Sequence, residues 1–159
     1  MSTRTSMAEW LASSHPDPEQ VWAEWKTDGV AVIPLGPQYG AVRIPEAIVH
    51  AAVESTDPDN VAIVLAQHLD GPVIHDAHGR NYYALTRSDA DIDWGPAVRG
   101  VEQLAPRTHL GVPVGARCEN SPETPLYWAV PGLRPGHCNA SAVGVLIRRG
   151  AERLSEVPR

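Results

Sequence analysis

Residues 72–86 read PVIHDAHGRNYYALT, and this stretch decides the fold. It holds two short runs of mainly β-branched, aromatic and aliphatic side chains, residues 72–75 and 82–86, on either side of the turn candidate Ala77-His78-Gly79-Arg80. Runs of this length that are bounded by turn residues are typical of β-strands. The sequence therefore predicts that a sheet forms around this segment.

Further strands are expected before and after this stretch. The segments are residues 30–35, 41–44, 61–67, 108–114 and 126–130. The first two flank a segment that contains Gly36-Pro37 and Gly40, and we interpret them as a β-hairpin. Residues 87–107 are acidic and then punctuated by glycine and proline, so an irregular crossover with at most one helical turn, near residues 97–104, is expected there.

Helices are expected at three places where start signals precede apolar residues at helical spacing. Asp17-Pro18 begins the first, which ends at Asp28-Gly29; Pro45 begins the second, which Asp57-Pro58 closes; and Asn139 caps the last. These elements predict an α/β fold of the α+β kind, with a single mixed, largely antiparallel sheet of about 6–7 strands flanked by about 3 helices.

The length of 159 residues suits a single domain with its own core. We expect residues 16–155 to form this α/β domain and residues 1–15 to be a flexible leader. One helical turn at residues 7–11 is expected to pack Trp10 and Leu11 back on the body.

The charge and hydropathy of the chain limit its partners and location. Thirteen Lys and Arg against nineteen Asp and Glu give a net charge of −6, which disfavours binding to nucleic acid. The first residues lack the apolar core of a secretory signal, and no apolar run approaches the roughly 18 residues of a membrane span. A cytoplasmic location without a membrane partner is expected.

Two groups of residues carry metal-ligand chemistry. His75, Asp76 and His78 place two imidazoles and a carboxylate within four residues, but a hairpin turn is the favoured interpretation. A second group, Cys118, His137 and Cys138, lacks the paired Cys-x-x-Cys spacing of a zinc ribbon, so reduced buried thiols are favoured there. No cofactor is expected from either group, and zinc is the alternative.

An acidic cluster and three rings complete the candidates. Asp89, Asp91 and Asp93 alternate, and on a strand they would share one face as in two-metal phosphoryl-transfer sites, but a solvated loop start with Asp caps is the favoured interpretation. A groove bordered by Trp94, His109 and Trp128 is the candidate ligand pocket. No glycine-rich phosphate loop, nucleophile elbow or dinucleotide fingerprint is present in the sequence.

The order of segments resembles that of small actinobacterial proteins related to the bifunctional DNA primase/polymerase N-terminal domain. The matching segments are residues 21–25 (VWAEW), 30–35 with Gly36 and Tyr39, 41–45 (AVRIP), 71–73 (GPV), 82–85 (YYAL), 110–113 (LGVP) and 127–131 (YWAVP). Active members of this group are expected to carry an Asp-x-Asp pair on a strand, a catalytic histidine on a neighbouring strand and a further acidic residue.

The expected strands 61–67 and 72–75 contain no Asp-x-Asp pair, and Asp89-Ala90-Asp91 falls in the expected crossover. The resemblance therefore implies a mixed α/β scaffold that has lost its polymerising centre, because function lives in sites grafted on folds. The first hypothesis is a non-catalytic binding or regulatory module that acts through a protein partner or a small ligand, with a homodimer possible.

Two alternatives stay open. One is a metal-dependent nucleotidyltransferase that uses Mg²⁺ or Mn²⁺ with Asp89, Asp91 or Asp76 and with His75 or His78. The other is a structural zinc-binding interaction protein that uses the Cys118, His137 and Cys138 group.

Overall fold

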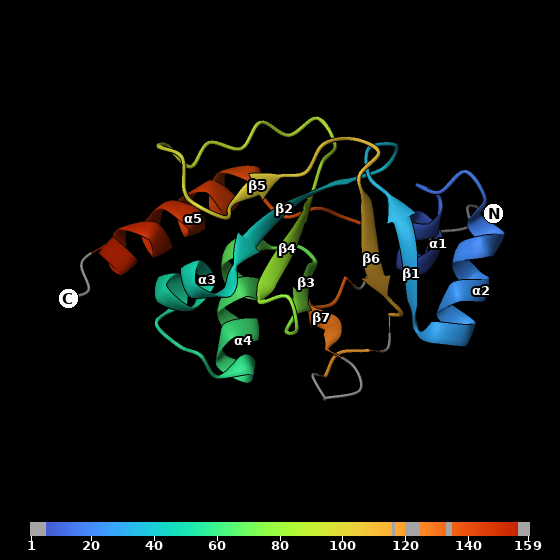
Figure 1. Ribbon diagram of the computed structural model, residues 1–159, viewed down its shortest axis with the longest axis horizontal. Coiled ribbons are helices and arrows are strands. Elements are labelled where there is room, and N and C mark those ends of the chain that lie inside the picture. The colour runs from blue at the N-terminus through green and yellow to red at the C-terminus, as the bar shows by residue number, and fades with distance from the viewer. Residues whose placement is uncertain (1–5, 116, 120–124, 133–134, 156–159) are drawn as a thin grey trace.

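The computed structural model describes residues 6–115, 117–119, 125–132 and 135–155, and these form an α+β fold (Figure 1). The helices are α1 (Met7–Ala12), α2 (Pro18–Asp28), α3 (Glu46–Val53), α4 (Pro58–Leu69) and α5 (Ala140–Ser155). The strands are β1 (Val30–Pro34), β2 (Gly40–Pro45), β3 (Val73–Asp76), β4 (Asn81–Thr86), β5 (Glu102–Gln103), β6 (His109–Pro113) and β7 (Leu126–Val130). The predicted fold class is confirmed.

The strands of the described residues divide between two sheets rather than forming one. Five of them lie in the order β5-β2-β4-β3-β7, and β1 pairs with β6 in a separate ribbon. Every strand pair in these two sheets is antiparallel. The predicted pair of strands within residues 72–86 is confirmed as β3 and β4, in which His75 lies opposite Tyr82.

The predicted hairpin of residues 30–35 and 41–44 is wrong. β1 pairs with β6 and β2 pairs with β4, so the chain leaves one sheet at Gly36 and enters the other at Gly40. The backbone of Leu35 bonds to Thr108 and Arg107, which extends the β1–β6 pairing beyond the strand ends. Turn residues mark where a strand stops, but the pairing itself depends on which distant strand completes the core.

The strand predicted at residues 61–67 is also wrong, because this segment lies in α4. Pro58 is in the first turn of the helix, and Val61, Leu65 and Leu69 are buried at a spacing of four residues. The Asp57-Pro58 signal therefore starts a helix, whereas α3 ends earlier, at Val53. Helical periodicity and a start signal outweigh the β-propensity of the valines and isoleucine here.

The other predicted helices are confirmed, and α1 forms where one helical turn was expected. In α1, Leu11 is buried against the body of the protein. The side chain of Asn139 accepts a hydrogen bond from the backbone N–H of Ala142 and so caps α5. The crossover at residues 87–107 is irregular apart from the short strand β5.

Two apolar clusters lie on opposite faces of the five-stranded sheet. One face is covered by α3, α4 and α5, and the other packs on α1, α2 and the β1–β6 ribbon (Figure 1). Alternate residues of each central strand supply the two clusters, as Val73 and Ile74 do in β3. None of the helices in the described residues has the length and apolar character that a membrane span requires.

Candidate functional site

Three rings lie side by side across the middle of the five-stranded sheet. His75 on β3 stands directly opposite Tyr82 on β4 and Tyr127 on β7. The imidazole of His75 stacks on the ring of Tyr82 with 4.0 Å between centroids and 4° between planes. The edge of Tyr127 meets the same imidazole at 5.2 Å. The strand register alone therefore brings these side chains together, on the face covered by helices.

A chain of hydrogen bonds passes through the same histidine. Nε2 of His75 is 2.5 Å from Oε2 of Glu46, and Nδ1 of His75 is 2.6 Å from the hydroxyl of Tyr127. The side chain of His75 is 7% exposed and that of Glu46 is 23% exposed. Glu46 is the first residue of α3, where a negative charge is favoured by the helix dipole. We call these three residues the Glu46–His75–Tyr127 network.

The positions of the protons follow from the donors and acceptors in this network. An ionised Glu46 only accepts, so a neutral His75 donates from Nε2 and accepts at Nδ1. Tyr127 then donates its hydroxyl proton to His75, and the lone pairs of its oxygen stay available as acceptors. When His75 carries both protons, Nδ1 donates instead, and the hydroxyl of Tyr127 becomes a donor to any third group. The protonation state of His75 thus decides whether the Tyr127 hydroxyl acts as an acceptor or as a donor towards a third group.

The surroundings keep both tyrosines protonated at neutral pH. Burial raises the pKa of Tyr127, and the charges of Glu46 and Asp59 raise it further. Burial also raises the pKa of Tyr82, with smaller contributions from Tyr127 and Glu46. Phenols in this state are hydrogen-bonding groups and poor nucleophiles.

His50 joins the site from α3 and gives it a pH-dependent contribution to stability. Its Nε2 lies 2.9 Å from the hydroxyl of Tyr82. Burial lowers the pKa of His50 below its ordinary value of 6.5. The charge of Glu46 raises this pKa in part, and the charge of His75 lowers it further. The unfolded chain therefore takes up a proton at a higher pH than the folded chain does. This contribution to stability is fully present above the pKa that His50 has in the unfolded chain. It is lost as the pH falls towards the lowered pKa of His50 in the folded chain.

We expect the urea midpoint of the protein to decrease between about pH 7.5 and pH 5.5, where an unperturbed histidine titrates. In His50→Gln, whose amide still reaches a hydrogen-bond partner, the decrease should be smaller, because Gln does not titrate. Urea unfolding of both proteins at the two pH values measures this. Equal decreases in the two proteins would show that His50 does not contribute.

Tyr127 also lines a surface hollow of about 330 Å³ between the start of α4 and β7. The other lining residues are Pro58, Asp59, Ala62, Cys118, Glu119 and Ala129. Two acidic residues, Asp59 and Glu119, therefore line one small space together with Tyr127 of the network. The thiol of Cys118 is protonated there, because burial and then the charge of Glu119 raise its pKa. We call this space the Tyr127 hollow.

The three residues proposed as a turn-based metal site are not brought together. His75 is bound within the network, whereas the carboxylate of Asp76 accepts a hydrogen bond from the N–H of Gly79. His78 is exposed in the turn. Successive residues of a strand point to opposite faces, so His75 and Asp76 face away from each other.

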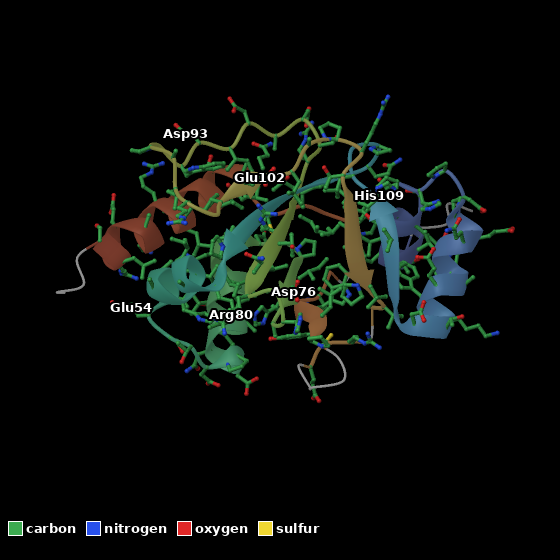
Figure 2. All side chains as sticks on the ribbon, viewed as in Figure 1. Glu54, Asp76, Arg80, Asp93, Glu102 and His109 are labelled. Atoms are coloured by element: carbon green, nitrogen blue, oxygen red, sulfur yellow. The ribbon has the colours of Figure 1, made fainter. Side chains whose placement is uncertain are left out.

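The acidic cluster lies apart from the network as well. Asp89 and Asp91 are exposed on the crossover, and Asp89 forms an ion pair with Arg87 at 3.1 Å. Figure 2 places the labelled Asp93 on this crossover and Asp76 at the far end of β3. In the part of the chain that the structure describes, no three His, Cys, Asp or Glu side chains are grouped as metal ligands.

The remaining predicted residues lie in three separate environments. Trp94 packs on the cluster beneath the helices, whereas Trp128 is buried on the opposite face and donates from Nε1 to the carbonyl of Pro113 at 2.9 Å. His109 is exposed at the start of β6 (Figure 2). Cys118 and Cys138 are free thiols, exposed and buried respectively. His137 contacts the ring of Trp10 instead.

Sequence reasoning named His75 but missed its partners, because Glu46 and Tyr127 lie 29 and 52 positions away from it. The usable signal was the alternation within residues 72–86 and 126–130, which assigns faces but not register. Comparison of the chain with protein-family models, curated proteins and solved structures gave no match in any of the three. The chemistry of the site itself is therefore the basis for a function.

Proposed function

We propose that the chain is a non-catalytic binding or regulatory module that holds a positively charged amine or guanidinium group in the Tyr127 hollow. The group belongs either to a small ligand or to a side chain of a partner protein. The single observation that carries this proposal is the Glu46–His75–Tyr127 network, which ends at a hollow lined by carboxylates.

The first argument is the polarity of the tyrosine oxygen. With Glu46 ionised and His75 neutral, the only proton of the Tyr127 hydroxyl is directed at Nδ1. A third group at this oxygen must then be a donor. Ammonium and guanidinium groups are donors that accept nothing, so they match it.

The second argument is charge. Asp59 and Glu119 line the same hollow, and the charge of Asp59 contributes to the raised pKa of Tyr127. Hydrogen bonds between a cation and a carboxylate are about twice as strong as neutral ones. The net charge of −6 also attracts cations to the protein surface.

The third argument concerns catalysis. The raised pKa of Tyr127 keeps its hydroxyl protonated, which favours recognition over nucleophilic attack. Asp89 and Asp91 are exposed on the crossover, away from His75, so no grouping of described residues favours the nucleotidyltransferase. The degenerate primase-polymerase-like scaffold stays a prediction, as does the cytoplasmic location.

Calorimetric titration with n-butylammonium, Nα-acetyl-lysine amide and Nα-acetyl-arginine amide tests the proposal. We expect saturable binding that weakens about tenfold in Asp59→Asn and in Tyr127→Phe, each of which removes one charge or one hydrogen bond. Asp91→Asn and Tyr83→Phe are matched controls outside the hollow and should bind as the parent does. Binding of the free amine indicates a small ligand, whereas preference for the amino-acid amides indicates a protein side chain.

Two results would overturn this function. One is the absence of saturable binding by all three probes up to about 10 mM, a concentration that detects even weak sites. The other is binding of equal strength in the parent and in both hollow variants.

A further inference from the structure

A second cavity lies on the opposite face of the sheet, between it and the β1–β6 ribbon. Its volume is about 240 Å³, and we call it the inter-sheet cleft. It is lined from the five-stranded sheet by Arg43, Asp76, Tyr83, Leu126 and Leu104, which follows β5 and bonds to the backbone of Ala41, and from the other side by Thr108, His109, Leu110 and Gly111. Figure 2 labels Asp76 on the sheet side and His109 on the ribbon side.

The strand order separates two opposite charges across this cleft. Arg43 on β2 lies directly opposite Tyr83 on β4, and the next strand, β3, carries Asp76. Neighbouring strands are about 4.8 Å apart, so the backbones of β2 and β3 are roughly 10 Å apart. Among the described residues, Arg43 forms its ion pair with Glu102 and none with Asp76. The cation and the anion therefore flank the cleft without neutralising each other directly.

Both charged groups keep binding capacity for a ligand. The ion pair with Glu102 is made by Nη2 of Arg43 at 2.7 Å, and a guanidinium has five N–H donors. Asp76 accepts the N–H of Gly79 with Oδ1, and a carboxylate has about four lone-pair positions. Tyr83 lines the cleft from β4, the strand between β2 and β3. Burial raises the pKa of Tyr83 most, Asp76 raises it further and Arg43 lowers it.

We propose that the inter-sheet cleft binds a small zwitterion, namely an α-amino acid with an aliphatic side chain. Arg43 receives the carboxylate, Asp76 receives the ammonium group, and the hydroxyl of Tyr83 bridges the two. The leucines at positions 104, 110 and 126 form the apolar part of the lining and contact the side chain of the amino acid.

The dimensions agree with this ligand. Asp76 lies two residues beyond Ile74, the β3 residue opposite Tyr83, so the backbones at Arg43 and Asp76 are offset by roughly 7 Å along the strands as well as roughly 10 Å across them. Charged hydrogen bonds are about 2.8 Å long, so two of them and the short span of an amino acid fit within this separation together with the two side chains. The volume is below the roughly 300–1,000 Å³ of pockets that hold drug-sized ligands, which favours a smaller molecule.

The inference does not depend on the Tyr127 hollow. Tyr83 and Tyr82 are adjacent on β4 and face opposite sides of the sheet, so the two sites share no side chain. Either site can fail while the other stands.

Calorimetric titration with L-leucine tests the cleft, with 4-methylpentanoate as the probe that lacks the ammonium group and isoamylamine as the probe that lacks the carboxylate. We expect saturable binding of L-leucine and at least tenfold weaker binding of both analogues. All three probes are titrated into Asp59→Asn protein, so that binding of an ammonium group in the Tyr127 hollow contributes little.

Three variants locate the binding. Arg43→Gln, Asp76→Asn and Tyr83→Phe should each weaken L-leucine at least tenfold, and Asn at position 76 keeps an oxygen for the N–H of Gly79. Arg99→Gln and Asp91→Asn are the matched controls and should leave its affinity unchanged. The proposal is overturned if L-leucine does not bind saturably up to about 10 mM, or if Arg43→Gln and Asp76→Asn bind it as the parent does.

Discussion

Replacing Gly150 with alanine is expected to lower the free energy of unfolding by about 3 kcal/mol, because the added methyl group overpacks a buried helix contact. Gly150 is buried in α5, and a Cβ at this position would overlap the backbone carbonyl oxygen of Ile48 in α3. Backbone atoms cannot rotate away as a flexible side chain can, so the two helices must separate. Urea unfolding of the parent and the variant measures the change.

The sign of this effect is informative, because intrinsic helix propensity alone predicts that alanine would stabilise the helix. In an exposed helix interior, alanine is more favourable than glycine by about 1 kcal/mol. Gly115→Ala serves as the matched control, since nothing lies within 4 Å of a Cβ there, and its change should stay below about 1 kcal/mol. A Gly150→Ala protein as stable as the parent would contradict the close contact between α3 and α5.

The last helix shows why composition alone misjudges such positions. The sequence predicts α5 from its cap at Asn139, and intrinsic helix propensity alone would make Gly144 a weak point of this helix. In the structure a Cβ at Gly144 would overlap the backbone carbonyl of Asp93 in the crossover. Both buried glycines of α5 thus allow backbones distant in sequence to approach closely. That requirement is invisible until the partner segment is known.

Local signals predicted the elements better than their partners. Proline and asparagine at helix starts located α2, α3 and α5, and the alternation in residues 72–86 located β3 and β4. The error at residues 61–67 arose because a short apolar run suits a strand as well as a buried helix face. The error in pairing β1 arose because register and partner are decided by the whole core.

Of the three residues in the Glu46–His75–Tyr127 network, only His75 was predictable from the sequence. His75 was named as a candidate beside Asp76 and His78, but its hydrogen-bond partners lie elsewhere in the sequence. Glu46 comes from the start of α3, and Tyr127 is placed opposite His75 by the pairing of β7 with β3. Asp59 enters through the first turn of α4, a helix whose residues 61–67 were predicted as a strand. A site assembled from four elements cannot be read from spacing within any one of them.

Replacing His75 with leucine is expected to lower the free energy of unfolding by about 2 kcal/mol, the usual loss when a buried polar group is left without its partner. Leucine fills much of the space of the imidazole but offers neither a donor to Glu46 nor an acceptor to the buried Tyr127. Glu46 is partly exposed and regains water, so the loss is mainly that of the hydrogen bond between His75 and Tyr127.

A double-mutant cycle separates this network from simple packing. In the Tyr127→Phe background the hydroxyl is already absent, so His75→Leu should cost about 1 kcal/mol less than it does in the parent. Tyr83→Phe, on the other face of the sheet, is the matched background in which the cost of His75→Leu should be unchanged. Urea unfolding of the single and double variants gives both values. If the two backgrounds gave the same cost, the hydrogen bond between His75 and Tyr127 would contribute nothing, and the polarity argument for the Tyr127 hollow would lose its basis.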